Sequence, residues 1–298
     1  MSDRLAGQVA IVTGASRGIG KAIAEAFARD GAAVAVVART EEVWDDRLPG
    51  TVHETVAAIE AEGGHAVAIR ADLSQPEDVE TLVDRARRAL GPIDILVNNA
   101  AVTVPGRPPG AERPAAPRPP HPARAEPRAA ARPEGIPAGS FLDFPLRGYR
   151  LHFEVGLFAS YRLMQLVLPD MIVKGHGAIV NISSLAAFVP GEGPYEHPGR
   201  PGPIAYGGNK AALHHLTQSV AVEMAAHGIA VNVLSPSEPV LTPGNLVAAA
   251  GETNWASPEE FAEATLRVAL ATPDTMTGQL LWSDDVLHPE LGRRGWLR

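Results

Sequence analysis

Continuous apolar runs alternate with helical segments along the first hundred residues, and this order constrains the fold most. The predicted strands are QVAIVTG, AAVAVVA, HAVAIRADL and IDILVNNA. The predicted helices between them cover residues 19–29, 51–62 and 77–90, and a glycine follows each helix. Strands that are apolar throughout, rather than on alternate residues, are buried on both faces. Such strands separated by helices predict a parallel sheet covered by helices on both sides.

The same alternation returns in the second half of the chain. A helix is predicted over 150–173, with an interruption near Pro169. Further strands are predicted over GAIVNISS, IAVNVLSP and TGQLLWS. One more helix carries Tyr206, and a last long helix begins at Ser257 with a capping-box-like signal. A chain of 298 residues with this pattern can bury a substantial core.

Residues 105–139 break the pattern. This segment of 35 residues contains 11 Pro, 9 Ala and 6 Arg, and its one large aliphatic side chain is Ile136. It cannot bury enough surface to offset the entropy lost on ordering. We therefore expect a disordered or polyproline-like insert. Two roles remain open for it, a basic arm that docks a partner or a solvated loop without function.

Charge and composition exclude several classes of function. The net charge of -8 leaves no basic field for nucleic acid or an anionic membrane. The absence of cysteine excludes disulfides, thiol catalysis and cysteine-ligated zinc, and no carboxylate spacing near His214 and His215 indicates a metal site. No signal peptide is visible, and no apolar run approaches the ~18 residues of a membrane helix. We expect a cytoplasmic protein that binds a small-molecule substrate, without nucleic acid, membrane or metal.

A glycine-rich turn, TGASRGIG, joins the first predicted strand to the first helix. Gly14, Gly18 and Gly20 permit a tight turn, close approach of the backbone to a phosphate, or close packing of helix on sheet. The helix that follows offers unpaired N–H groups and the positive end of its dipole to an anion. On the first strand of an alternating chain, this turn predicts a dinucleotide site.

The second predicted strand ends in Ala38 and Arg39 rather than in an acidic residue. A carboxylate at this tip would bind the ribose 2'-hydroxyl of NAD. Arg39 and Arg17, which lies in the glycine turn, could instead hold a 2'-phosphate between two guanidinium groups. The sequence therefore favours NADP(H) over NAD(H), and the alternative is that the arginines face solvent.

Tyr206 and Lys210 are four residues apart on one predicted helix, so they share a face. A free tyrosine titrates near ~10, which is too high for a base at neutral pH. A nearby ammonium favours the phenolate and lowers that pKa. The pair is therefore a candidate acid/base, and the alternative is a half-buried tyrosine beside a solvated lysine.

These motifs occur in the order seen in a known family. TGASRGIG is followed by Asp72-Leu73, NNAA, NISS and YGGNK, and then by Thr242 after Pro236. The chain resembles the classical type of short-chain dehydrogenase/reductase (SDR) over nearly its whole length, residues 105–139 excepted. The resemblance implies a single Rossmann-type α/β domain over 1–298, doubly wound, with a seven-stranded, mainly parallel sheet in the order 3-2-1-4-5-6-7. It also implies a homodimer or homotetramer.

The resemblance assigns roles to individual residues. Tyr206 would be the catalytic acid/base, and Lys210 would lower its pKa and bind the nicotinamide ribose. Ser184 would form a hydrogen bond with the substrate oxygen. Ser183 is the less favoured of the two adjacent serines, because the family's serine occupies the later position.

The implied cofactor site follows the same motifs. Residues 72–73 would flank the adenine and residues 99–100 would line the cleft. Val240 and Thr242 would meet the carboxamide end of the nicotinamide. The full set of candidate cofactor-binding residues is Gly14, Ser16, Arg17, Gly18, Ile19, Gly20, Arg39, Asp72, Leu73, Asn99, Ala100, Tyr206, Lys210, Pro236, Val240 and Thr242.

The chain departs from the family pattern in the helix before the fifth strand. The family has an asparagine within a V-N-L segment there, and this chain has Val155-Gly156-Leu157. The resemblance implies that an asparagine there holds a water in the proton relay behind the lysine. Gly156 either leaves room for an extra water or impairs the protein. If Tyr206 and Lys210 are the acid/base pair, an asparagine at position 156 is expected to raise turnover, and it should not lower stability if its side chain fits.

Two loops also depart from the pattern. The loop between Ser184 and Tyr206 is longer than in the family, and its Tyr195 and His197 face either the substrate or solvent. Pro236 is followed by serine rather than glycine, which is expected to reshape the nicotinamide pocket.

Two hypotheses of function follow. The first is an NADP(H)-dependent oxidoreductase that transfers hydride between nicotinamide and a ketone or secondary alcohol, with Tyr206 assisted by Lys210 and Ser184. The second is a nucleotide-binding or scaffold protein of this family that has lost turnover, and Gly156 and the insert motivate it. Cofactor binding without turnover of any carbonyl compound would distinguish the second from the first.

Overall fold

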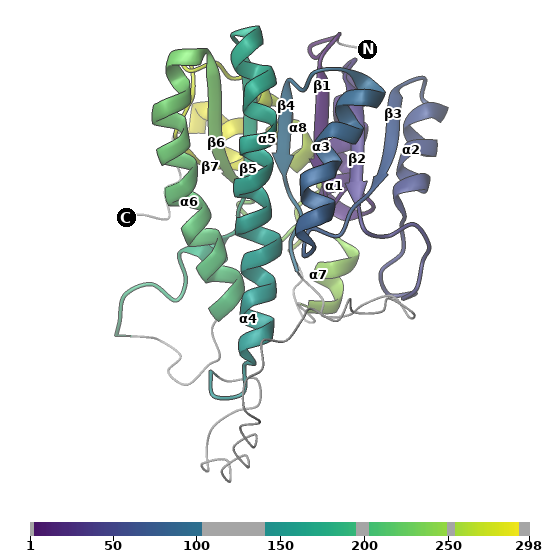
Figure 1. The fold of residues 1–298 in the computed structure, drawn as a ribbon. Coiled ribbons are helices and arrows are strands. Elements are labelled where there is room, and N and C mark those ends of the chain that lie inside the picture. The colour runs from purple at the N-terminus through teal and green to yellow at the C-terminus, as the bar shows by residue number, and fades with distance from the viewer. Residues whose placement is uncertain (1–2, 103–140, 195–202, 249–253, 292–298) are drawn as a thin grey trace, which may run out of the picture.

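Seven parallel strands form one sheet with helices on both faces (Figure 1). The computed structural model describes residues 3–102, 141–194, 203–248 and 254–291. The strand order is β3-β2-β1-β4-β5-β6-β7, and each pair of neighbours is parallel. The predicted sheet, its strand number and its order are therefore confirmed. The insert predicted at 105–139 lies outside the described residues, as do Tyr195 and His197.

The strands lie where the apolar runs predict them. They are β1 (Val9–Thr13), β2 (Ala33–Ala38), β3 (His65–Arg70), β4 (Ile95–Asn98), β5 (Gly177–Ile182), β6 (Ile229–Ser235) and β7 (Leu280–Trp282). Every residue of β1, β4 and β6 is buried, as expected of central strands covered on both faces.

Helices follow the strands in the predicted order. They are α1 (Gly18–Arg29), α2 (Val52–Ala61), α3 (Pro76–Leu90), α4 (Leu146–Phe153), α5 (Ala159–Lys174), α6 (Ile204–Met224), α7 (Pro243–Ala248), α8 (Pro258–Ala269) and α9 (Ser283–Leu287). Ser257 caps α8 as predicted, because its Oγ accepts hydrogen bonds from the backbone N–H groups of Glu259 and Glu260. Within the described ranges, no helix is long and apolar enough to cross a membrane.

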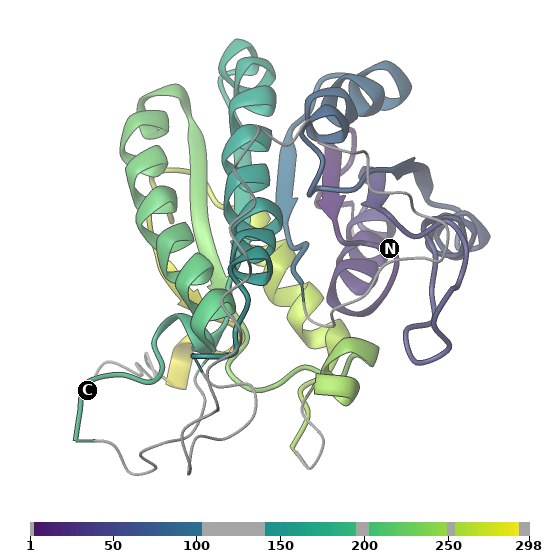
Figure 2. The same ribbon diagram turned by 60° about the horizontal axis from the view of Figure 1, so that its bottom comes forward.

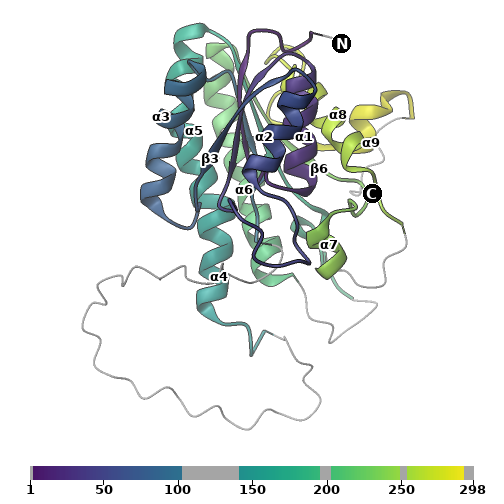
Figure 3. The same cartoon turned by 90° about the vertical axis from the view of Figure 1, so that its right-hand side faces the viewer.

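The predicted interruption near Pro169 is wrong. Pro169 lies inside α5, which is continuous from Ala159 to Lys174. The irregular turn is one element earlier, at Glu154–Phe158, which forms a π-helical turn between α4 and α5. Figures 1 and 3 show α4 and α5 as one long column that extends past the edge of the sheet. The wide turn holds Gly156, whose missing side chain leaves room for a close neighbour.

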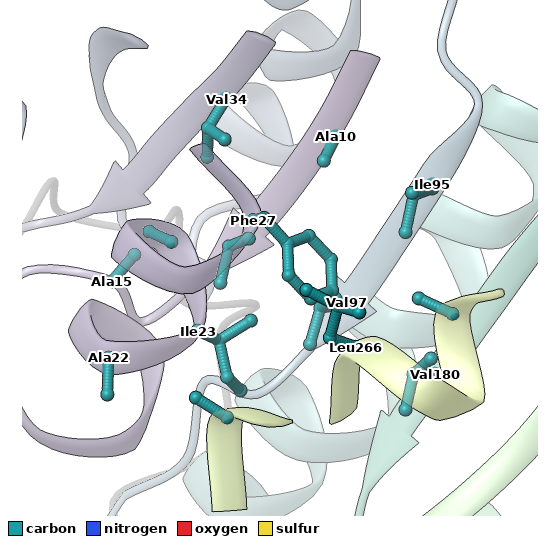
Figure 4. Packing of buried hydrophobic residues seen from close by; sticks show 14 of the residues in the cluster. Ala10, Ala15, Ala22, Ile23, Phe27, Val34, Ile95, Val97, Val180 and Leu266 are labelled. Atoms are coloured by element: carbon teal, nitrogen blue, oxygen red, sulfur yellow. The ribbon is translucent and has the colours of Figure 1, made fainter. Parts of the chain in front are cut away.

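Two hydrophobic clusters lie on opposite faces of the sheet. One packs α1, α2 and α8 against side chains that include Val97 and Val180. Figure 4 shows the ring of Phe27 from α1 beside Val97 of β4 and Leu266 of α8. The other cluster packs α3, α5 and α6 on the opposite face. The two layers bury the sheet from both sides, which accounts for strands that are apolar throughout.

The order of strands reverses between β1 and β4, so a crevice forms outside their carboxyl ends. The Thr13 hydroxyl joins the ends of the two strands at this point. It donates to the carbonyl of Val97 (3.2 Å) and accepts from the N–H groups of Asn99 (3.0 Å) and Ala100 (3.1 Å). Figure 2 turns this edge of the molecule toward the viewer.

At the opposite end of the strands, where β1 and β4 begin, a buried carboxylate stabilises the fold. Asp94 is 2% exposed, and its side chain accepts hydrogen bonds from the Val9 N–H (2.8 Å) and the Lys174 ammonium (2.6 Å). Asp94→Ala should lower the free energy of unfolding by about 2–4 kcal/mol, because the Val9 N–H and the ammonium lose their acceptor. Chemical denaturation would measure this. The exposed Asp84→Ala is the control, and an equal loss in both variants would contradict the assignment.

Candidate active site

A cavity of about 620 Å³ opens at the carboxyl ends of the strands. Its volume lies in the range of sites that hold small molecules and cofactors. Every residue predicted to bind the cofactor lines it, from Gly14 of the first turn to Thr242 after β6, and so does Ser184. Residues from the six loops that follow β1 to β6, and from the start of α6, therefore meet around one cavity.

The glycine-rich turn forms the floor of this cavity. Gly14 and Gly18 have φ values of +67° and +54°, a region that favours glycine. A Cβ on Gly14 would lie 2.9 Å from the Cα of Ala100, and one on Gly20 would lie 2.3 Å from the carbonyl oxygen of Gly14. Helix α1 has no side-chain cap and no acidic residue in its first turn. Its N–H groups therefore remain available to an anion, and the turn fits the pyrophosphate of a dinucleotide.

Arg17 and Arg39 both line the cavity beside this turn. Arg17 donates from Nη2 to the carbonyl of Gly50 (3.0 Å), and its buried Nε has no partner among the described residues. Burial lowers the pKa of Arg17, and the neighbouring charge of Arg39 lowers it further. Two guanidinium groups that repel each other at a partly buried edge are suited to an anion that lies between them.

The segment after β6 closes the other side of the cavity. Thr242 accepts a hydrogen bond from the Asn245 N–H (3.1 Å) at the start of α7. A Cβ on Gly18 would lie 3.1 Å from the side chain of Thr242, so this segment rests on the glycine turn. The Ser237 N–H donates a hydrogen bond to the Ser283 Oγ (3.0 Å). This bond holds the loop that begins at Pro236.

Tyr206, Lys210 and Ser184 lie together in the lining of the cavity. The Lys210 Nζ lies 5.8 Å from the centroid of the Tyr206 ring and donates to the carbonyl of Ile182 (2.6 Å). Helix α6 approaches the loop after β5 closely, because a Cβ on Gly207 would lie 2.3 Å from the carbonyl oxygen of Ala186. This close approach brings the tyrosine of one element to the serine of another.

Burial dominates the electrostatics of these groups. Lys210 is 2% exposed, and burial lowers its pKa to about 8. Burial raises the pKa of Tyr206, and a hydrogen bond with Ser184 acts in the opposite direction. The expected lowering of the Tyr206 pKa by Lys210 is therefore not found. The Lys210 ammonium donates instead to the Ile182 carbonyl, and burial of the phenol disfavours its charged form.

The two adjacent serines have different surroundings, which supports the choice of Ser184. Ser183 is buried, and its Oγ lies 2.6 Å from the Nε2 of His214. Burial and the charge of Lys210 lower the pKa of His214 to about 4, so the imidazole is neutral near pH 7. Ser184 is partly exposed and lies beside Tyr206.

His152 is a cavity residue that the sequence reasoning missed. It lies on α4, its ring centroid is 6.2 Å from that of Tyr206, and the two rings meet edge to face. Burial, followed by the charge of Lys210, lowers its pKa. The available signal was its position one helical turn before Gly156, on the same side of the helix. The cavity also includes Trp44 and Asn245, for which the sequence gives no motif.

Gly156 lies against Asn209 of α6. A Cβ on Gly156 would lie 2.3 Å from the Asn209 Oδ1, and Asn209 is 1% exposed. The condition attached to an asparagine at 156, that its side chain fits, is therefore not met. A carboxamide is already present beside this turn, and it comes from the helix that carries Tyr206.

Comparison with known proteins agrees with this geometry. The family model for short chain dehydrogenases matches residues 8–113 and 134–245. L-rhamnose 1-dehydrogenase (NAD(P)(+)) of Sphingomonas sp. (strain SKA58) is 28% identical over 282 residues, which cover 93% of this chain and 89% of that protein. The 7alpha-hydroxysteroid dehydrogenase of Escherichia coli (strain K12) is 28% identical over 288 residues, with 93% of each chain covered.

A solved structure extends the likeness to the whole fold. It is a Beutenbergia cavernae protein described as an NAD(P)-dependent gluconate 5-dehydrogenase, with NADP bound at low occupancy. It superposes with a TM-score of 0.70 at 28% identity, covering 95% of this chain and 98% of that chain. The chain therefore belongs to the short-chain dehydrogenase family, and it is an NAD(P)-dependent oxidoreductase.

Proposed function

We propose that the protein is an NADP(H)-dependent oxidoreductase that interconverts a ketone and a secondary alcohol. The observation that carries the proposal is the meeting of Tyr206, Lys210 and Ser184 in the lining of a cavity that Arg17 and Arg39 also line. A bound nicotinamide cofactor supplies or accepts the hydride. The remaining requirements are a proton donor or acceptor and a way to hold the substrate oxygen.

These three side chains match the requirements. Tyr206 would exchange a proton with the substrate oxygen, and Ser184 would hold that oxygen by a hydrogen bond. Lys210 has three N–H donors, of which one bonds the Ile182 carbonyl, so others are available to a ribose hydroxyl. Its positive charge would favour the phenolate during proton transfer.

The rest of the cavity would hold the cofactor. The glycine turn and the N-terminus of α1 would bind the pyrophosphate. Asp72 and Leu73 would flank the adenine, while Asn99, Ala100, Val240 and Thr242 would lie along the remainder of the molecule. Arg17 and Arg39 would hold the 2'-phosphate, which is the basis for the preference for NADP(H).

The organisation of the whole chain is part of the proposal. We infer that residues 1–298 form one domain interrupted by 105–139, and that the protein acts as a homodimer or homotetramer on a small-molecule substrate. The non-catalytic alternative relied on the missing asparagine at 156. The Asn209 carboxamide beside Gly156 weakens that argument.

The proton-transfer role can be tested with Tyr206→Phe, which removes the hydroxyl and keeps the ring. Turnover of a ketone panel with NADPH should fall by at least ~10²-fold, because positioned proton transfer is lost, while the dissociation constant of NADPH should change little. Tyr161→Phe is the control, since that hydroxyl contacts Gln165 at an exposed position on α5. Undiminished turnover in Tyr206→Phe would contradict the assigned role.

The cofactor preference can be tested with Arg39→Ala and Arg17→Ala. Each variant should weaken NADPH binding by about tenfold or more, because a charge-assisted hydrogen bond to phosphate is lost, and should affect NADH binding less. Isothermal titration of both cofactors gives the comparison. Arg47→Ala serves as the control. It removes an exposed arginine that lies in the same loop as Arg39 and is paired with Asp45. Equal effects on NADPH and NADH would show that the arginines do not contact a 2'-phosphate.

The buried ammonium predicts a dependence of stability on pH. The pKa of Lys210 is about 8 in the folded protein, and its ordinary value, which applies to the unfolded chain, is 10.5. Between these two pH values the unfolded chain therefore binds more protons than the folded protein. The free energy of unfolding should therefore rise with pH in this window. Between pH 7 and pH 10, the free energy of unfolding of the wild type should rise by about 2 kcal/mol relative to that of Lys210→Met.

Denaturation at several pH values would measure this difference. Lys21→Met is the control, because Lys21 lies on the partly exposed side of α1 beside Glu25. A constant difference between wild type and Lys210→Met across this range would mean that Lys210 keeps its ordinary pKa in the fold.

A further inference from the structure

The Asn209 carboxamide has an unusual set of contacts. Its Nδ2 donates to the carbonyls of Ala205 (2.9 Å) and Tyr206 (2.8 Å), which lie in the first turn of the same helix. Two carbonyl acceptors require an amide nitrogen at this place, so the orientation of the carboxamide is fixed. Its Oδ1 is buried and has no hydrogen-bond donor among the described residues.

Gly156 lies directly against that oxygen. The Cβ that any other residue would place there would be 2.3 Å from the Oδ1 and 3.0 Å from the Cγ of Asn209. The hydrogen that glycine carries in that direction therefore points at the oxygen, and a Cα–H group is a weak donor. The π-helical turn Glu154–Phe158 holds this hydrogen at the surface of α6.

We infer that Asn209 is a positioning residue for Tyr206, and that Gly156 lacks a side chain in order to admit it. This inference rests on the proposed acid/base role of Tyr206. Asn209 links the turn that carries Tyr206 to the π-helical turn between α4 and α5. The family pattern has an asparagine at the position of Gly156. This chain has the glycine there, and its asparagine, Asn209, lies on the facing helix α6.

The start of α6 explains why such a link is needed. The helix begins at Ile204, so Tyr206 is its third residue. Pro203 precedes it and provides no side-chain cap. The first turn of a helix frays readily, because its N–H groups have no partners within the helix. Hydrogen bonds from Asn209 to the carbonyls of Ala205 and Tyr206 hold this turn, and with it the phenol.

The first test removes the carboxamide. Asn209→Ala improves helix propensity, so a loss of function would not come from a weaker helix. Asn209→Asp keeps the size and removes the N–H donors. Both variants should lower the turnover number by ~10–100-fold, as expected for a displaced catalytic group, with the dissociation constant of NADPH changed by less than about twofold.

The second test adds a methyl group on the facing helix. Gly156→Ala should displace the carboxamide and lower the turnover number by about tenfold or more. Gly148→Ala on α4 is the matched control, because a Cβ there would come no closer than 3.5 Å to any side chain. In the Asn209→Ala background, Gly156→Ala should change turnover by less than about twofold, since the group it collides with is gone.

A third measurement needs no turnover and therefore remains informative if the proposed activity is wrong. Hydrogen exchange of the backbone amides of residues 209–210, which bond the first-turn carbonyls, should accelerate in Asn209→Ala, Asn209→Asp and Gly156→Ala. Exchange near the end of α6 should stay unchanged. Wild-type exchange at 209–210 in all three variants would overturn the inference. Turnover losses that multiply in the double variant, or an inactive Gly148→Ala, would also overturn it.

Discussion

The hydroxyl group of Thr13 holds the two halves of the sheet together at the point where ligands enter. It bonds the carbonyl of Val97 and the N–H groups of Asn99 and Ala100, so the ends of β1 and β4 share one side chain. The glycine turn then approaches Ala100 so closely that Gly14 has no room for a Cβ. The crevice, the glycine turn and the residues that line the cavity all depend on this junction.

Local patterns were sufficient to predict most of the fold. Strands such as β1 and β6 are apolar throughout because both faces are covered, and this property is visible in the sequence itself. The helix starts carry their own signals, as the cap at Ser257 illustrates. The predicted site residues also meet around one cavity, because parallel strands bring all their carboxyl ends to one edge.

Contacts between distant segments could not be predicted in the same way. A proline usually breaks a helix, yet Pro169 lies within α5 and the π-helical turn occurs at Gly156, where a second helix packs. The sequence shows a glycine in place of an asparagine at 156, and it shows Asn209 in YGGNK, but nothing local connects them. Their contact exists only after α6 packs against the π-helical turn. The burial of Lys210, which sets its pKa, depends on the same packing.

The charges around the cavity bear on the anionic ligand that the proposed function assigns to it. The chain has a net charge of -8, yet three basic residues, Arg17, Arg39 and Lys210, line this cavity against two acidic ones, Asp72 and Glu238. Burial disfavours the charged forms of Arg17 and Lys210, so keeping these two charges in the cavity costs free energy of folding. An anionic ligand reduces that cost, and by linkage its binding raises the pKa of a nearby ammonium. Under the proposed function, a phosphorylated cofactor would therefore keep Lys210 protonated while Tyr206 exchanges its proton.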